Sequence, residues 1–313
     1  MSHNFDVLCV GNAKIDTFLT LHKIKDHLRY LEATNELCIK FGEKINVDKA
    51  EILLGGNASN VAVGLSRLGL KVGIIAEIGK DEFAQKIINT LNAENVDTSS
   101  IFQTEGQESS FSTIINFKGE RTIFSEHVKR AHNFNFDNLF SKWVYLTSLG
   151  EEWENAYQKT VDFVKNTNAH LTFNPGTLQI AAGKERLINV LSLTNILIVN
   201  KEEGQSLLKT GNQNAKEILI GLQKLGPKIV VITDGKNGSY VIDENGNIVE
   251  EKIVETEVIE KTGAGDAYSS GFLGAVLYNK SIKDAMRWGA RNSASVITKV
   301  GAQTGLLGRK GLE

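Results

Sequence analysis

Six short runs of apolar and β-branched residues recur along this chain, and segments with helical spacing follow several of them. The runs are FDVLCV (5–10), VGIIA (72–76), WVYLT (143–147), HLTFN (170–174), ILIVN (196–200) and KIVVIT (228–233). Helical spacing is marked by Val61, Leu65 and Leu68, by Phe83, Ile87 and Leu91, and by Ile218, Leu219, Leu222 and Leu225. Unalternating apolar strands are typical of parallel sheets covered on both faces. The pattern therefore predicts a doubly wound α/β fold with a mostly parallel central sheet.

Two segments interrupt this alternation. Residues 14–46 carry β-like fragments among charged residues, and residues 109–126 read as a hairpin with its turn near Lys118 and Gly119. Neither segment has the length or spacing of a βα unit. We expect both to form a small sheet inserted into a single domain of residues 1–313, standing over one edge of the main sheet as a lid.

Composition narrows the classes of partner. The 313 residues are 41% hydrophobic and carry a formal net charge of −2, which argues against a general nucleic-acid binder. No apolar run approaches about 18 residues and no signal-peptide pattern opens the chain, so we expect a cytoplasmic protein that does not enter a membrane. Cys9 and Cys38 lack the spacing of a metal or redox motif, which favours reduced thiols.

The stretch KTGAGDAY (261–268) places small residues immediately before an apolar run with helical spacing. Gly263, Ala264 and Gly265 would then start a helix, where unpaired N–H groups and the positive end of the helix dipole can hold an anion. Asp266 would stand beside that anion. Taken alone, the stretch favours a simpler role for Asp266 as an N-cap residue.

Polar residues end three of the predicted strands, namely Asn174, Asn200 and Thr233. Ligands collect beyond the carboxyl ends of strands in open parallel sheets, so we expect these side chains to line one crevice. Asn200 and Glu203 offer a neutral oxygen and a carboxylate three residues apart, which suits a partly hydrated Mg²⁺. The alternative is a helix start with an acidic first turn.

A glycine-rich segment, TDGKNGSY, follows the last of these strands. Thr233, Gly235 and Gly238 would let a nucleotide phosphate approach the backbone closely. The same segment also fits a hairpin turn before a strand at 239–242, and the two roles are compatible.

Two motifs near the N-terminus supply groups for a polyhydroxylated substrate. Asp16 lies in GNAKID, and GGNASN contains Gly55, Gly56, Asn57 and Asn60. Carboxylate and amide side chains satisfy buried hydroxyl groups, and glycines allow close approach. The simpler alternatives are an exposed loop acid for Asp16 and an N-cap for Asn57.

Together these parts match phosphoryl transfer to a hydroxyl group, which needs an anion cradle, a metal and a base; Asp266 fits the base. The alternative is a non-catalytic sugar- or nucleotide-binding protein, but such a protein has no need of a base. The chain has neither GxGxxG directly after a strand nor GxxxxGK[ST], which argues against a dehydrogenase and a P-loop ATPase.

These motifs, in this order, resemble the ribokinase-like (PfkB) family of carbohydrate kinases. The matching stretches span nearly the whole chain: GNAKID, GGNASNVAVGLSRLG, IGKDEFAQKI, GERTI, NKEE, TDGKNGS, TGAGDAYSSGF and ARNSASVITKVGA. The resemblance implies a doubly wound sheet with a β lid, ATP and Mg²⁺ as cofactors, and phosphorylation of a sugar or nucleoside hydroxyl. It also implies a homodimer formed through the lid.

The resemblance assigns roles to residues by motif. They are Asp266 as catalytic base, Gly263, Ala264 and Gly265 as anion hole, Asn200 and Glu203 for Mg²⁺ and phosphate, Thr233, Gly235 and Gly238 as nucleotide loop, Asn292 near adenine, and Asp16, Gly56 and Asn60 for the sugar.

The chain departs from the family pattern at several positions, of which three bear on the site. Glu260 and Lys261 replace the usual Asp-Thr or Asp-Pro, a segment that helps hold an activating monovalent cation in many members. Because Lys261 would bring an ammonium group near that site, we expect only weak dependence on K⁺. Lys14 stands where ribokinases tend to have Asn, so ribose itself does not follow from the resemblance.

Overall fold

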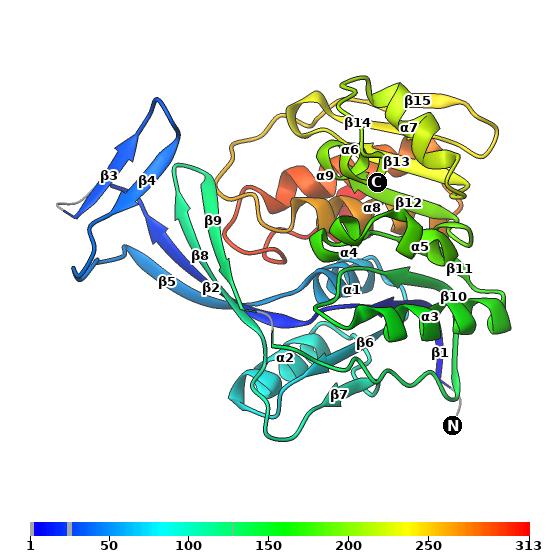
Figure 1. The fold of residues 1–313 in the computed structure, drawn as a ribbon, viewed down its shortest axis with the longest axis horizontal. Coiled ribbons are helices and arrows are strands. Elements are labelled where there is room, and N and C mark those ends of the chain that lie inside the picture. Colours follow the sequence, from blue (N-terminus) through cyan, green and yellow to red (C-terminus); the bar gives the residue numbers. More distant parts are fainter. Residues whose placement is uncertain (1–2, 24–26, 127) are drawn as a thin grey trace.

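The computed structural model of this chain describes residues 3–23, 27–126 and 128–313. Within these residues, the main body is a nine-stranded sheet with helices on both faces, and a smaller sheet projects from one side (Figure 1). The strand order of the main sheet is β15-β14-β13-β12-β11-β10-β1-β6-β7. This architecture confirms the predicted doubly wound α/β fold.

The strands from β13 to β7 in this order run parallel, and an antiparallel hairpin completes the sheet beside β13. The parallel strands are β1 (His3–Val10), β6 (Val72–Ile78), β7 (Ile101–Gln103), β10 (Leu139–Leu146), β11 (His170–Phe173), β12 (Ile196–Asn200) and β13 (Ile229–Thr233). The hairpin consists of β14 (Ser239–Ile242) and β15 (Ile248–Glu251). Each of the six predicted runs overlaps one of the parallel strands.

Helices cover the two faces of the main sheet. One face carries α1 (Asn57–Arg67), α2 (Glu82–Ala93), α8 (Ala264–Leu277), α9 (Ile282–Val296) and α10 (Arg309–Leu312). The other face carries α3 (Trp153–Thr167), α4 (Thr177–Ala182), α5 (Lys184–Leu191), α6 (Lys201–Leu208) and α7 (Ala215–Gln223). The three helices expected from apolar spacing are confirmed as α1, α2 and α7. Among the described residues, no helix combines the length and apolar character needed to cross a membrane.

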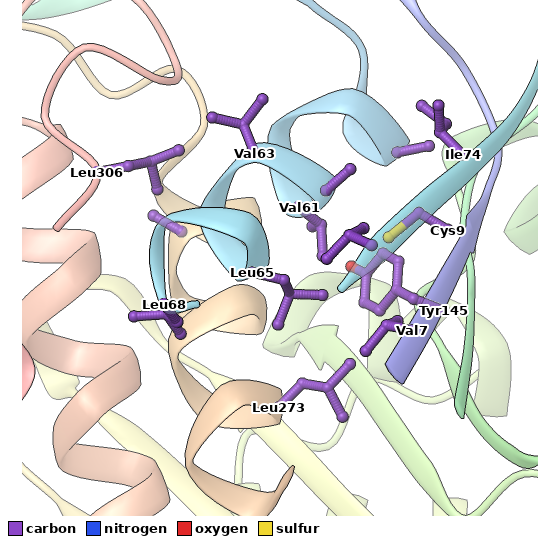
Figure 2. Packing of buried hydrophobic residues seen from close by; sticks show 14 of the residues in the cluster. Val7, Cys9, Val61, Val63, Leu65, Leu68, Ile74, Tyr145, Leu273 and Leu306 are labelled. Atoms are coloured by element: carbon purple, nitrogen blue, oxygen red, sulfur yellow. The ribbon is translucent and has the colours of Figure 1, made fainter. Parts of the chain in front are cut away.

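The core explains why the central strands are apolar on both faces. Successive side chains of a strand point to opposite sides, so Val7 and Cys9 join the cluster under α1 while Leu8 and Val10 join the cluster under α3. Figure 2 shows the first cluster, with Leu65 of α1 packed among the residues of the sheet. This packing holds the N-terminal end of α1 at the carboxyl edge of the sheet.

The smaller sheet has the strand order β5-β2-β8-β9 in the described part of the chain. Its strands are β2 (Lys14–Leu21), β5 (Lys49–Gly55), β8 (Phe111–Phe117) and β9 (Glu120–Ser125), and a short hairpin, β3 (Leu28–Leu31) and β4 (Glu36–Ile39), lies beyond them. We call the four-stranded sheet the lid. It extends past the predicted limit of residue 46, because β5 pairs with β2 along its whole length.

The β8–β9 hairpin turns at Lys118 and Gly119, as predicted, with φ angles of 52° and 76°. Its tip contacts the segment that precedes α8. Asn116 Nδ2 donates a hydrogen bond to the carbonyl oxygen of Ile259 at 3.4 Å. Glu120 forms an ion pair with Lys261. These lid–loop contacts join the free end of the lid to the chain just before the predicted anion cradle.

Candidate active site

The helix α8 begins where the sequence predicts it. Gly263 is the N-cap with φ of 79°, and a Cβ atom there would collide with Ala302, so only glycine fits. Gly265 faces open space, since a Cβ there would meet no non-neighbouring atom of the described residues within 4 Å. The N–H of Ala264 points back to the carbonyl of Lys261 at 3.3 Å. The first turn therefore offers open backbone and the positive end of the helix dipole to an anion.

Asp266 lies in the first turn of α8 and is 8% exposed. The N-cap interpretation is wrong, because Gly263 occupies that position. Instead, Asn60 Nδ2 of α1 donates a hydrogen bond to Asp266 Oδ2 at 2.8 Å. Asn60 Oδ1 in turn accepts a hydrogen bond from Gln303 Nε2 at 2.8 Å, which fixes the orientation of the Asn60 amide. The carboxylate is thus held by a chain of two hydrogen bonds.

Burial raises the pKa of Asp266 from 3.8 to about 7. The hydrogen bond from Asn60 and the charge of Lys14 act in the opposite direction, whereas the negative charges of Asp16 and Glu203 add to the rise. Asp266 therefore exchanges its proton close to neutral pH, where a general base is most effective.

The glycine pair before α1 permits a close approach by Asp16. A Cβ atom at Gly55 would collide with the Asp16 carboxylate, and one at Gly56, whose φ is 93°, would collide with the backbone of Asn12. Asp16 is 4% exposed, so the interpretation as an exposed loop acid is wrong. Gly56, and not Asn57, is the N-cap of α1. These residues bring Asp16 close enough to Asp266 for its charge to act on that carboxyl group, which Asn60 holds.

Asn200 and Glu203 form a capping box at the start of α6. Asn200 Oδ1 accepts from the Glu203 N–H at 2.8 Å, and Glu203 Oε2 accepts from the Asn200 N–H at 2.9 Å. Burial raises the pKa of Glu203, and the Asn200 N–H opposes this effect. The helix start with an acidic first turn, the alternative interpretation, is therefore present in the structure. Asn200 Oδ1 and Glu203 Oε2 each accept one N–H and keep a further lone pair, so both can still bind a ligand.

The predicted nucleotide loop lies next to this capping box. Thr233 pairs with Asn200 across β13 and β12, and Asn174 follows the neighbouring strand β11. Gly238 has a φ of 92°, and a Cβ there would collide with the backbone of β15, whereas Gly235 faces open space. The segment also forms the turn before β14, as predicted. The three strand ends are therefore neighbours at one edge of the sheet.

Asn292 does not join the other predicted residues. It lies on the buried face of α9, where its Nδ2 donates to the Ala267 carbonyl at 2.9 Å and to Ser270 Oγ at 3.1 Å. Its Oδ1 accepts from the Leu307 N–H at 2.9 Å. Both amide hydrogens are thus used to hold α8 against α9, and the contact of Asn292 with adenine stays a prediction.

Three residues at the site carry no signal of their own in the sequence. Gln303 orients Asn60, and Ser112 of the lid accepts a hydrogen bond from Lys14 at 2.7 Å. Glu260 is fully buried and accepts hydrogen bonds from both the N–H and the hydroxyl of Thr262, at 2.7 and 2.6 Å. The sequence marks Glu260 only as a departure from a motif, since its burial is a property of the folded chain.

Comparisons with known proteins concern the family and the fold of this chain. A family model described as pfkB family carbohydrate kinase matches residues 8–307. The chain is 29% identical over 283 residues to a ribokinase of Haemophilus influenzae, covering 85% of this chain and 88% of that protein. It is 28% identical over 268 residues to a 5-dehydro-2-deoxygluconokinase of Clostridium botulinum, covering 78% of each. The structure of a putative ribokinase II from E. coli in complex with ATP and Mg²⁺ matches with a TM-score of 0.79 at 18% identity, over 100% of this chain and 98% of that chain.

Proposed function

Because the chain belongs to the pfkB family of carbohydrate kinases and is a carbohydrate or nucleoside kinase, we propose that it moves the γ-phosphoryl group of ATP to a hydroxyl group of a sugar or nucleoside. Asp266 is the general base in this proposal, and the turn formed by Gly263, Ala264 and Gly265 is the anion hole. Relatives with different acceptors match this chain to a similar degree, so the acceptor has to be argued from the site itself.

The environment of Asp266 carries the proposal. A carboxyl group with a pKa of about 7 is half deprotonated at neutral pH, and its carboxylate binds a proton more tightly than that of an ordinary aspartate. Asn60 holds its orientation, and the small residues beside it leave room for the transferring phosphoryl group. The acceptor hydroxyl would lie between Asp266 and that group, lose its proton to the carboxylate and attack the phosphorus.

The turn at the head of α8 stabilises the charge that accompanies this transfer. Preorganised N–H groups and the helix dipole are aimed at the place where negative charge gathers, so they need no rearrangement during the reaction. The open space at Gly265 is consistent with this role, because nothing in the described chain fills it.

ATP and Mg²⁺ fit the residues at the ends of β12 and β13. One carboxylate oxygen of Glu203 and the side-chain oxygen of Asn200 already accept N–H bonds, so this pair would hold Mg²⁺ through water. No cluster of three or more acidic, histidine or cysteine residues able to hold a metal occurs among the described residues. Thr233, Gly235 and Gly238 would contact the nucleotide phosphates. Bound Mg²⁺ would neutralise charge on the transferring group.

The sugar or nucleoside would lie under the lid against Asp16, Gly56 and Asn60. The burial of Asp16 and the close approach at Gly56 support this assignment. We further propose a homodimer formed through the lid, since Ile52 and Phe124 lie in one cross-strand row of its outer face and are 45% and 58% exposed. Sedimentation at twice the monomer mass of 34.3 kDa is the expected result.

Weak dependence on K⁺ stays a prediction from the sequence, whereas the contacts of Lys261 and Glu260 favour the opposite proposal, activation by K⁺. The Lys261 ammonium pairs with Glu120 of the lid and so does not occupy a cation site. Glu260 Oε2 is buried and has no hydrogen-bond partner among the described residues, which would suit a monovalent cation. Comparing rates in KCl and NaCl at equal ionic strength tests this point.

The decisive experiment is Asp266→Asn. We expect the rate of ATP-dependent phosphorylation to fall about 10²- to 10⁴-fold while acceptor binding persists, because general-base catalysis supplies a factor of this size. Acceptors are found with a coupled ATP-consumption assay over pentoses, hexoses, their acids and nucleosides. Unchanged turnover in Asp266→Asn would contradict the mechanism, and binding without turnover in the natural protein would favour a non-catalytic sensor.

A further inference from the structure

Lys14 and Asp16 form a charge pair inside the proposed acceptor pocket. Both side chains leave the same face of β2, because residues two apart in a strand point the same way. Lys14 Nζ lies 3.9 Å from Asp16 Oδ1, and the two side chains are 17% and 5% exposed. The pair is therefore sheltered from water, and each charge offsets the other.

Each member of the pair keeps a hydrogen-bonding position for a ligand. The Lys14 ammonium donates to Ser112 Oγ at 2.7 Å and to Ser125 Oγ at 3.2 Å, and an ammonium group has a third hydrogen. Asp16 Oδ1 is buried and has no hydrogen-bond partner among the described residues. An unsatisfied buried carboxylate oxygen is costly, so it needs a donor such as a bound hydroxyl group.

A second cationic side chain near the proposed pocket, that of Arg130, already has negatively charged neighbours. Arg130 is 4% exposed and lies in a cavity beside the start of β2, where Glu77 and Asp81 are its charged neighbours and Gln107 Oε1 accepts its hydrogen bond at 3.0 Å. His132 lines the same cavity, and burial lowers its pKa, so the ring is neutral at pH 7. Neither group provides an unmatched positive charge.

Negative groups exceed positive ones around the pocket. Burial raises the pKa of Asp16, and the nearby charge of Glu260 adds to this effect while Lys14 opposes it. Asp266 is a third carboxyl group, and the charge of Asp16 adds to the rise in its pKa. The described residues therefore place one ammonium, that of Lys14, among three carboxyl groups.

From this arrangement, and resting on the proposed kinase function, we infer that the acceptor is an uncharged polyol and that Lys14 is a further residue that binds it. A hydroxyl group of the acceptor donates to Asp16 Oδ1, and a neighbouring oxygen accepts from Lys14. Two adjacent oxygens of a neutral sugar or of a nucleoside ribose supply this pattern. An aldonic acid or a sugar phosphate would instead add a negative charge, at a cost we expect to be about 10²-fold in kcat/KM.

The test compares each neutral aldose and nucleoside with the matching aldonic acid and monophosphate. Kinetics are measured for the natural protein, Lys14→Met, Lys14→Asn and the matched control Lys49→Met, whose lysine pairs with Glu51 on the same lid but is 62% exposed. Lys14→Met should raise KM for the neutral acceptor about 10- to 100-fold, as expected for the loss of a hydrogen bond from a charged donor. Lys14→Asn retains a donor and should recover part of the loss. Lys49→Met should change nothing. Kinetics are measured at pH 8.5, above the pKa of about 7 of Asp266 in the natural protein, and a pH profile of each Lys14 variant corrects for the rise in this pKa when the Lys14 charge is lost.

Calorimetric binding without ATP separates this inference from the kinase proposal. Preferential binding of the neutral member of each pair, weakened in Lys14→Met and unchanged in Lys49→Met, supports the inference even if no acceptor is phosphorylated. Because Lys14→Met removes the positive charge, the anionic member should stay at least as disfavoured in that variant. A sugar acid or sugar phosphate as the best ligand overturns it even if kinase activity is present. An unchanged KM in Lys14→Met, with melting temperatures equal to that of the natural protein, also overturns it.

Discussion

Asp266 destabilises the folded protein, and replacing it with Asn should therefore increase stability. Burial holds its pKa at about 7 instead of the ordinary 3.8. Below pH 4 the carboxyl group is protonated in both the folded and the unfolded chain. Between pH 4 and 7 the unfolded chain releases this proton while the folded chain keeps it, so the free energy of unfolding falls as pH rises through that window.

The size of the effect follows from the two pKa values. A difference of about 3 between them corresponds to roughly 4 kcal/mol above pH 7, at about 1.36 kcal/mol for each factor of ten in the proton affinity. An Asn at this position can still accept the hydrogen bond from Asn60, but its own N–H₂ group needs a partner, which reduces the gain. We therefore expect Asp266→Asn to be more stable by about 1–3 kcal/mol at pH 8 and by almost nothing at pH 4.

The assay is urea unfolding between pH 4 and 8, followed by tryptophan fluorescence. Asp81→Asn is a control in which the stability should change in the opposite direction. Burial tends to raise the pKa of Asp81, but hydrogen bonds from Ser109 and Ala84 outweigh it and lower this pKa. Replacing Asp81 should therefore reduce stability near neutral pH. A gain in Asp266→Asn that does not depend on pH would refute the reasoning. So would a loss of stability at pH 8.

Two further predictions concern the same turn. Asn60→Leu removes the hydrogen bond that lowers the pKa of Asp266, so this pKa should rise by about 1–2 and kcat at pH 7 should fall about 5- to 50-fold. Activity should recover near pH 9, and a pH–rate profile that keeps its shape would contradict the prediction. Gln303→Leu should have a smaller effect, because Gln303 bonds to Asn60 and not to Asp266 itself. Gly265→Val fills the open cradle and should lower kcat by at least about 10²-fold. Its melting temperature should stay within a few degrees of the natural value, and a large drop would show that Gly265 serves packing instead.

Features encoded locally could be predicted from the sequence. The apolar strands, the helix α1 and the start of α8 each depend on residues that are close together in the chain, so composition and spacing identify them. The same holds for the hairpin at Lys118 and Gly119, where the turn residues set the geometry. The convergence of Asn200 and Thr233 follows from the general rule for parallel sheets.

Features that depend on distant pairing could not be predicted. The edge strand β5 precedes the glycine motif and has no turn signal of its own, and only its pairing with β2 identifies it as part of the lid. Asn292 fits its motif, yet the rotation of α9 directs its side chain into the core. Lys261 finds its partner Glu120 across 141 positions of sequence, a contact that no local pattern encodes.

The lid–loop contacts affect how water can enter the site when the lid opens. Asn116 and Glu120 connect the hairpin tip to Ile259 and Lys261, only a few positions ahead of the turn at Gly263. The hairpin cannot swing outward without either breaking these contacts or dragging the turn with it. An opening of the lid that keeps these contacts would therefore displace the turn at Gly263 as well. Under the proposed mechanism, water that enters in this way would meet a displaced turn, which would limit hydrolysis of ATP.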